Sequence, residues 1–375
     1  MYFCNSFYGH DWFEIYCKSV IIMVKYNTIK RCVLALLLMA TTIGLVAFEK
    51  NVPDGPDKKA RVLRCVKPPY LKAGDRVALV SPSYFKNMKE VEKAAKVLRE
   101  RGLVPVIAPN VGKEYAGRYA GTVEERVSDL RWALADTTIK AIICNRGGYG
   151  TIHYIDQISL AEWRANPKWL VGFSDVTTLH GLLSRAGVMS VHGTMSMFLA
   201  TRAKDTSSTL MRDLLMGRVP RYELPSHPQN IEGRASGILV GGNLCTITPN
   251  LGTQADATQG RDLILFIEEV EEGMHNIDRQ FNILMMNGVL DRCKGVVLGT
   301  FTDCEREFSY ESVEAMLRPY IEKYKIPLLC GFPGGHGKVN LPLVMGAPVT
   351  IDVRPDGATL QFNIDGQQQE FVVKN

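Results

Sequence analysis

The stretch "WLVGFSDVTTLHGLLSRAG", from Trp169 to Gly187, predicts a strand, a tight turn and a helix in direct succession. Its first residues are apolar and favour a strand, Ser174 stands at the turn, and apolar side chains then recur at helical spacing. Gly187 ends the predicted helix, because glycine readily takes the left-handed conformation found at helix C-termini. A strand followed at once by a helix is the unit from which α/β sheets are built.

The same alternation of strand and helix extends on both sides of this stretch. Further strands are predicted at 76–81, 104–109, 140–144 and 188–193, and further helices at 89–102 and 122–136. We therefore expect an α/β N-terminal domain over residues 68–218, a doubly wound parallel sheet with helices on both faces. In open sheets of this kind ligands bind beyond the carboxyl ends of the strands, which is where Ser174 falls.

The second half of the chain is richer in strands than the first. Residues 219–236 are proline-rich and polar and are expected to form a linker, followed by a smaller C-terminal domain at 237–375. The pair Asp356-Gly357 is typical of a hairpin turn. Strands are predicted at 237–244, 263–269, 295–301, 327–333, 349–353 and 359–364, and helices at 277–288 and 310–324. We expect a mixed or barrel-like sheet.

The N-terminal sequence has a different character. In residues 25–48 three basic side chains precede a long apolar run, which resembles a secretory signal or a signal anchor, and Met23 is an alternative start. We expect residues 1–48 to be a signal peptide or membrane anchor, and 49–67 to be a tether outside the fold. The protein would then reside in the cell envelope, either in the periplasm or anchored to the membrane. A buried N-terminal helix and a cytoplasmic location are the alternatives.

Composition and charge narrow the class of protein. With 46% hydrophobic and 22% charged residues, the 375-residue chain has the composition of a globular protein large enough for two domains. A formal charge of +5 without a basic stripe argues against nucleic-acid binding. The nine cysteines form no CxxC pair or zinc-like spacing, so we expect buried free thiols rather than a disulfide framework.

Two turns in the N-terminal half could take part in chemistry. Ser174 lies in "GFSDV", which has the first glycine of a GxSxG nucleophile turn but Val176 in place of the second. Ser174 is therefore either a nucleophile or only the cap of the following helix. The second turn is "NRGGYGT", Asn145 to Thr151, whose glycines can present backbone N–H groups to a phosphate or an oxyanion. A plain glycine turn is the alternative.

An acidic sequence begins at the end of the predicted strand at 263–269. Glu268 ends this strand, and Glu269, Glu271 and Glu272 come next. These carboxylates could hold a metal ion, but no histidine cluster accompanies them, and a solvated acidic loop is the preferred interpretation. Glu268 is the one that the end of the strand would direct into a cleft.

One histidine has the setting of a general base. His336 lies between glycines in "GFPGGHGKVNLPL", a loop that follows an apolar strand, whereas His180 and His192 fall in predicted helix and strand and suit packing roles. Ser174, Glu268 and His336 thus each follow a strand end, in the order nucleophile, acid, base. Such triads are defined by role and geometry rather than by sequence order.

Eight motifs in succession resemble those of the LD-carboxypeptidase family of serine peptidases, which includes hydrolases that give immunity to microcin C. The similarity covers about residues 70–365, and its motifs are "GDRVALVSPS", "NRGGYGT", "GFSDVTTLH", "VHGTM", "GGNLCTITPNLGT", "LFIEEVEE", "IDRQFNIL" and "GFPGGHGKVNLPLVMGAPVTID". The resemblance implies a Ser174–Glu268–His336 triad and an oxyanion hole formed by the N–H groups of Asp175 and Gly148. It also implies a homodimer without metal or cofactor.

The resemblance further implies the reaction. Ser174 would attack the carbonyl of an L,D peptide bond, and the expected substrate is a murein tetrapeptide stem that loses its terminal D-alanine. Arg146 would hold the substrate carboxylate or have only a structural role in its turn, and Tyr149 could supply an aromatic ring. The alternatives are hydrolysis of a microcin C-type peptidyl-nucleotide, and a non-catalytic envelope protein that binds peptides. An esterase of the α/β-hydrolase type would need the complete turn, so Val176 counts against it.

Overall fold

The computed structural model describes residues 61–305 and 307–373. The expected signal or anchor region at 1–48 and the first residues of the expected tether lie outside the described residues. Within the described part of the chain, no helix is both long enough and apolar enough to cross a bilayer.

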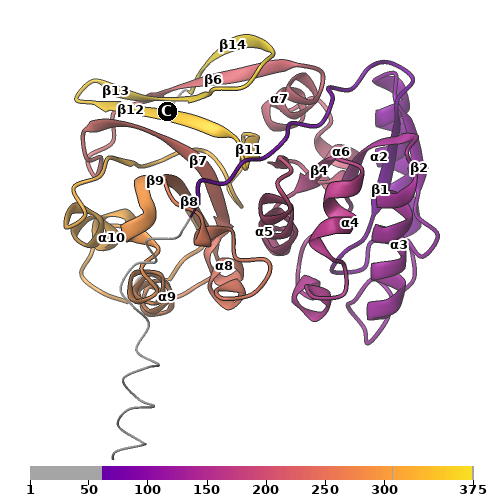
Figure 1. Cartoon of the computed structure of the whole chain (residues 1–375), viewed down its shortest axis with the longest axis horizontal. Helices are drawn as coiled ribbons and strands as arrows, with labels where there is room; N and C mark the ends of the chain where they lie inside the picture. The colour runs from indigo at the N-terminus through magenta and orange to yellow at the C-terminus, as the bar shows by residue number, and fades with distance from the viewer. Residues whose placement is uncertain (1–60, 306, 374–375) are drawn as a thin grey trace, which may run out of the picture. The chain divides into compact units, whose positions relative to one another are not determined.

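The N-terminal half forms a six-stranded sheet in the order β11-β5-β4-β3-β1-β2 (Figure 1). All neighbouring strands are parallel except β11, which pairs antiparallel with β5. The strands are β1 (Arg76–Val80), β2 (Val104–Ile107), β3 (Ile139–Cys144), β4 (Trp169–Gly172), β5 (Ser190–His192) and β11 (Leu343–Met345). The helices are α2 (Met88–Glu100), α3 (Val123–Ala135), α4 (Leu160–Ala165), α5 (Thr177–Ala186), α6 (Ser196–Arg202) and α7 (Thr206–Leu215), with short 3-10 turns η1 (Thr151–Tyr154) and η2 (Ser174–Val176). The predicted parallel α/β domain is confirmed.

Local signals explain where its helices begin and end. Thr122 and Glu125 form a reciprocal capping box at the start of α3, and the Asn87 side chain caps α2. Gly187 follows α5 with a left-handed φ of 80°, as the sequence predicted. The residues of β4 are buried throughout, which is expected of a central parallel strand covered on both faces.

The C-terminal half forms an eight-stranded mixed sheet in the order β10-β9-β8-β7-β12-β13-β6-β14 (Figure 1). Its strands are β6 (Arg218–Pro225), β7 (Gly233–Asn243), β8 (Leu263–Val270), β9 (Cys293–Thr302), β10 (Leu328–Leu329), β12 (Pro348–Arg354), β13 (Gly357–Phe362) and β14 (Gln367–Val372). The helices are α8 (Leu244–Asn250), α9 (Met274–Met286) and α10 (Val313–Glu322), with 3-10 turns η3 (Ala257–Gln259) and η4 (Leu290–Arg292). The expected mixed sheet is confirmed, and the described strands form no closed barrel.

Side-chain alternation along β8 separates two cores. Ile264 and Phe266 belong to the large core that includes the N-terminal sheet, whereas Leu265 and Ile267 belong to a second core with α9 and α10. Successive side chains of a strand point to opposite faces. Glu268 therefore continues the row of Ile264 and Phe266, on the face toward the N-terminal half.

Several segments differ from the sequence-based expectations. The expected linker at 219–236 contains most of β6 and the start of β7, because its prolines are accommodated in a strand whose inward side chains are still buried. Residues 61–67 of the expected tether are not outside the fold: Val62 bridges Arg261 and Val66 bridges Val188. The polar strand β14 was not predicted, since it lies at the edge of its sheet and carries glutamines.

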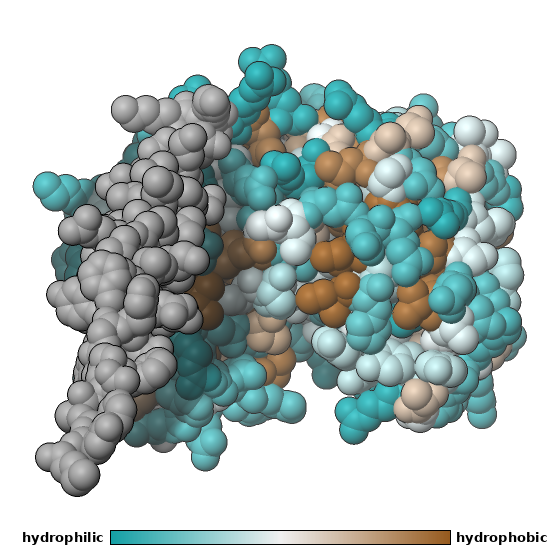
Figure 2. All heavy atoms as spheres, turned by 60° about the horizontal axis from the view of Figure 1, so that its bottom comes forward, coloured by the Kyte–Doolittle hydropathy of each residue, from teal (hydrophilic) through white to brown (hydrophobic). Residues whose placement is uncertain are grey.

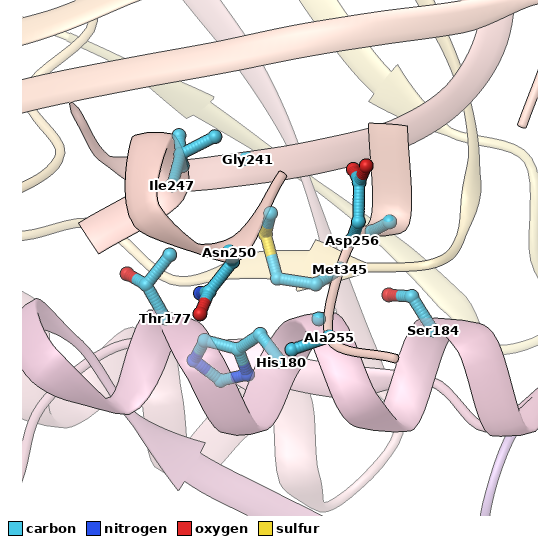
Figure 3. A pocket seen from close by; sticks show the side chains of 11 residues that line it. Thr177, His180, Ser184, Gly241, Ile247, Asn250, Ala255, Asp256 and Met345 are labelled. Atoms are coloured by element: carbon cyan, nitrogen blue, oxygen red, sulfur yellow. The ribbon is translucent and has the colours of Figure 1, made fainter. Parts of the chain in front are cut away.

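The two halves contact each other through α5 and β11. The Thr177 hydroxyl of α5 accepts a hydrogen bond from the N–H of Asn243 (3.1 Å), and Asn250 donates to Thr178 (3.2 Å). A small cavity is lined by α5 and by the segment that follows α8, and Figure 3 shows His180 and Ser184 of α5 on one side of it and Asp256 on the other. This interface and β11 set the position of the second sheet relative to the first.

The outer surface is mixed in character. In the face shown in Figure 2, brown hydrophobic residues are interspersed with teal hydrophilic ones. The described cysteines are all free, and three of them, Cys144, Cys293 and Cys330, are buried. The expectation of free thiols is thus met for the described cysteines, although Cys245 is exposed.

Candidate active site

Ser174 occupies a strained turn between β4 and α5. Its backbone φ is 66°, in the left-handed region that non-glycine residues rarely adopt. Phe173 is the N-cap of η2 and Val176 that of α5, and neither position has a side-chain capping hydrogen bond. Among the described residues the Ser174 hydroxyl has no hydrogen-bond partner. Ser174 is therefore not a helix cap, and the turn presents a half-buried, unpaired hydroxyl.

Two glycines make this turn sterically possible. A Cβ on Gly172 would lie 2.9 Å from both Val176 methyl groups, so the first glycine of the turn makes room for the valine that replaces the second. A Cβ on Gly147 would lie 2.9 Å from Ser174 Cβ and 3.1 Å from its Oγ. The "NRGGYGT" turn therefore lies directly against the serine.

The side chain of Asp175 fastens the two turns together. Its carboxylate accepts hydrogen bonds from Ser83 Oγ (2.6 Å) and from the N–H of Thr151 (3.0 Å), while the Thr151 hydroxyl donates to the Asp175 carbonyl (2.9 Å). Burial raises the pKa of the Asp175 carboxyl, against the lowering effect of these hydrogen bonds. The sequence motifs pointed only to the N–H of Asp175 and gave no sign of this role for its carboxylate.

Gly148 lies in the "NRGGYGT" turn, next to Gly147. It has a φ of 117°, and a Cβ there would fall 2.2 Å from the Tyr84 ring, so only glycine fits. Within the described residues its N–H donates no hydrogen bond. The N–H of Asp175 lies in the first turn of η2, where backbone N–H groups generally have no intrahelical partner.

Glu268 and His336 form a buried acid–imidazole pair. Glu268 is fully buried, and its Oε2 accepts hydrogen bonds from His336 Nδ1 (2.7 Å) and from the His336 N–H (3.2 Å). Burial lowers the pKa of His336, but the hydrogen bond and charge of Glu268, with the charges of Glu269 and Glu271, outweigh it, so the pKa is raised. Nδ1 faces the acid, which leaves Nε2 as the atom able to exchange a proton with a reactant.

The other acidic residues have separate surroundings. Glu269 accepts hydrogen bonds from Asn243 Nδ2 and from the N–H of Cys245, both at 2.7 Å, and is almost fully buried. Burial raises the pKa of Glu269. The expected solvated acidic loop is therefore wrong for Glu269, because β8 continues to Val270, whereas Glu271 is exposed. The described residues contain no group of three or more potential ligands placed to hold a metal.

The loop that carries His336 crosses from one sheet to the other. It leaves β10 of the second sheet and ends in β11 of the first, where Leu343 pairs with His192, which in turn pairs with Gly172. The His336 ring consequently lies 4.9 Å from the Phe173 ring, centroid to centroid. In this structure no hydrogen bond joins the imidazole to Ser174 Oγ; such bonds are often long before a substrate binds.

Thr300 and Asn340, which no sequence motif marks, hold this loop. Thr300 Oγ1 accepts from the N–H of Gly337 and donates to the carbonyl of Gly334, both at 3.2 Å. Asn340 Oδ1 accepts from the N–H of Gly335 at 2.9 Å. The two side chains thus fix the backbone on both sides of His336.

Valine has nearly the same volume as threonine, so Thr300→Val should displace the imidazole of His336 without creating a cavity or a clash. Because both hydrogen bonds are lost, we expect a free energy of unfolding lower by about 1–3 kcal/mol and a reduced kcat/KM. Thr300→Ser keeps the hydroxyl and should restore most of the activity. Urea unfolding and steady-state kinetics would measure both effects, and a fully active Thr300→Val protein would contradict the positioning role.

The remaining predicted residues surround the glycine turn. Arg146 is exposed, with its guanidinium carbon 5.7 Å from the Tyr84 ring centroid, and Tyr149 is 47% exposed and contacts His153. Both therefore lie at the surface beside the site.

Of the two histidines with expected packing roles, only one is fully satisfied. His180 contacts Ser190 Oγ (2.8 Å) and the Gly172 carbonyl (2.9 Å), and burial lowers its pKa to about 4. His192 is also fully buried, but neither ring nitrogen has a hydrogen-bond partner within the described part of the protein.

Comparison with known proteins agrees with this arrangement. The LD-carboxypeptidase N-terminal domain matches residues 77–193, and the LD-carboxypeptidase C-terminal domain matches residues 236–351. The chain belongs to the LD-carboxypeptidase family. As a member of this family it is a hydrolase, and the two matched segments correspond to the two halves that supply Ser174 on one side and the Glu268–His336 pair on the other.

Individual relatives cover most of the chain. The murein tetrapeptide carboxypeptidase of Pseudomonas aeruginosa is 30% identical over 71% of this chain and 89% of its own. The crystal structure of the muramoyltetrapeptide carboxypeptidase of Oxalobacter formigenes has 25% identity and a TM-score of 0.70, covering 78% of this chain and 99% of that one. The microcin C7 self-immunity protein MccF, in complex with aspartyl sulfamoyl adenosine, shares the fold at 21% identity, with a TM-score of 0.68 over 80% of this chain and 98% of that one.

Proposed function

We propose that this LD-carboxypeptidase uses Ser174, Glu268 and His336 as a catalytic triad to hydrolyse an L,D peptide bond, releasing D-alanine from murein tetrapeptide stems. The observation that carries the proposal is the buried Glu268–His336 hydrogen bond of 2.7 Å, held beside the strained turn of Ser174. The names of the P. aeruginosa and O. formigenes relatives support the choice of substrate.

The residues act in turn on the scissile carbonyl. His336 Nε2 takes the proton of Ser174 Oγ as the oxygen attacks, while Glu268 holds Nδ1–H and stabilises the imidazolium that forms. His336 then gives this proton to the departing amine of D-alanine. A water molecule enters, loses a proton to His336 and attacks the acyl-enzyme. His336 then returns this proton to Ser174 Oγ as the shortened peptide leaves, which restores both residues.

The backbone supplies stabilisation for the oxyanion. Asp175 follows the serine directly, Gly148 follows Gly147, which lies against Ser174, and no described residue accepts a hydrogen bond from the Gly148 N–H. Donors fixed in advance stabilise developing charge without reorganising. The Asp175 carboxylate contributes by holding both turns in register.

Location and assembly belong to the same proposal. The basic and apolar sequence at 25–48 supports activity in the cell envelope, where murein is found. A homodimer without metal or cofactor is the assembly implied by the family resemblance.

Mass spectrometry of purified muropeptides incubated with the protein tests the function. We expect tetrapeptide stems to be converted to tripeptide stems with release of free D-alanine, while pentapeptide stems remain. Cleavage of a peptidyl-nucleotide in place of the tetrapeptide would favour the microcin-type alternative. Binding of muropeptides with no cleavage would favour the non-catalytic alternative.

A further inference from the structure

Two exposed arginines converge on one tyrosine beside the glycine turn. The guanidinium carbons of Arg118 and Arg146 lie 5.8 and 5.7 Å from the centroid of the Tyr84 ring. At this range a guanidinium is attracted to the ring face, which restricts its orientation. The two arginines come from segments 28 positions apart (146 − 118), so tertiary structure brings both of them to the same ring.

Tyr84 is itself fixed to the site. Its N–H donates to the Gly147 carbonyl (3.3 Å), and its ring packs so closely on Gly148 that a Cβ there would lie 2.2 Å away. The next residue, Phe85, donates from its N–H to the Arg118 carbonyl (2.8 Å). The positions of both arginines are therefore tied to the turn that lies against Ser174.

Neither guanidinium has an acidic partner among the described residues. The ion pairs of the described chain include Arg131 with Glu162 and Arg221 with Glu370, but none with Arg118 or Arg146. Arg126, which lies nearby, is instead buried and donates to the carbonyls of Pro82 and Gly150. The surface beside the candidate oxyanion hole thus carries two unpaired cations.

We propose that Arg118 and Arg146 together bind the free C-terminal carboxylate of the substrate's D-residue. This inference rests on the proposed function and adds Arg118 and Tyr84 to its site. In a peptide cut at its last bond, the terminal carboxylate lies only about 4 Å from the scissile carbonyl carbon. A carboxylate held there by guanidinium groups places the last peptide bond at Ser174. The pair thereby restricts cleavage to the end of the chain.

Binding measurements on an inactive background isolate this role from catalysis. In Ser174→Ala protein, calorimetric titration would compare the murein tetrapeptide with its C-terminal amide. We expect the tetrapeptide acid to bind more tightly than its amide. Arg118→Gln should weaken binding of the acid by about 10- to 100-fold and leave binding of the amide unchanged. Arg146→Gln should act alike, and Arg118→Lys should retain part of the affinity, because it keeps the charge without the planar fork.

Arg99 is an exposed arginine of α2 that forms no ion pair with any described residue, so Arg99→Gln is the matched control and should change neither affinity. Equal weakening of acid and amide, or no weakening by Arg118→Gln, would overturn the inference. The proposed function has a separate test. It fails if protein with Ser174 intact binds the tetrapeptide acid more tightly than the amide but releases no D-alanine.

Discussion

Replacing Ser174 by alanine is expected to abolish release of D-alanine from murein tetrapeptides, with a loss in kcat of about 10³- to 10⁶-fold. The nucleophilic oxygen is removed, and no other hydroxyl stands at the tip of this turn. The fold should persist, because alanine tolerates the left-handed φ of 66° about as poorly as serine and the hydroxyl has no described hydrogen-bond partner to lose.

Two measurements and one control variant test this prediction. Quantifying D-alanine by mass spectrometry gives the loss of turnover, and circular dichroism with thermal melting shows whether the fold remains. Ser236→Ala, at an exposed position of β7, is the control and should leave turnover unchanged. Substantial turnover by a folded Ser174→Ala protein would exclude Ser174 as the nucleophile.

The second large effect is expected from Glu268→Gln, which should lower kcat by about two to four orders of magnitude. A glutamine keeps the shape of the side chain but loses the charge that stabilises the imidazolium. Its amide can also donate to Nδ1, which would favour the tautomer with the proton on Nε2. His336 could then no longer accept the proton of Ser174.

The pH dependence of the remaining activity should change as well. The pKa of His336 is raised, and the base form exists above that pKa, so the acid limb of kcat/KM in the native protein should lie above pH 6.5. Removing the charge and hydrogen bond of Glu268 leaves burial, which lowers the pKa, so the acid limb should move to lower pH. Activity is thus lost as the pH falls, and the Glu268→Gln protein should lose its remaining activity at a lower pH than the native protein.

Glu271→Gln provides the matched control for this shift. Glu271 is exposed and is the weakest of the charges that raise the pKa of His336, so its removal should move the acid limb slightly in the same direction and preserve kcat. A Glu268→Gln protein whose acid limb stays in place, or moves to higher pH, would contradict the pairing seen in the structure.

The sequence predicted the elements with strong periodicity well. The strands β1, β4 and β8 and the helices α3 and α5 lie within a few residues of their expected positions, because their apolar patterns and capping residues are local signals. Segments stabilised mainly by neighbours were missed. β11, which has three residues, was not predicted. β10 has only two of the seven residues expected for its strand, because the rest of that segment belongs to the loop that carries His336.

The candidate site shows the same division. Ser174 was selected by its strand-to-helix turn after Gly172, His336 by its glycine-rich loop, and Glu268 by the end of its strand. Ser83, Thr300 and Asn340 carry no such signal, since isolated hydroxyl and amide residues occur throughout any chain. Their roles depend on partners such as Asp175, Gly337 and Gly335, which only the folded chain brings within hydrogen-bonding distance.

By itself the sequence determined the α/β character of the first half, the strand-to-helix turn at Ser174 and the types of side chain available for catalysis. Tertiary structure alone brings the His336 ring against Phe173, the residue before Ser174. The antiparallel addition of β11 to β5 draws the His336 loop across to the first sheet, and the close approach of α5 at Gly181, where a Cβ would lie 2.0 Å from the Ala255 carbonyl oxygen, holds the halves together. Contacts between residues far apart in the chain leave no local periodicity, so only packing reveals them.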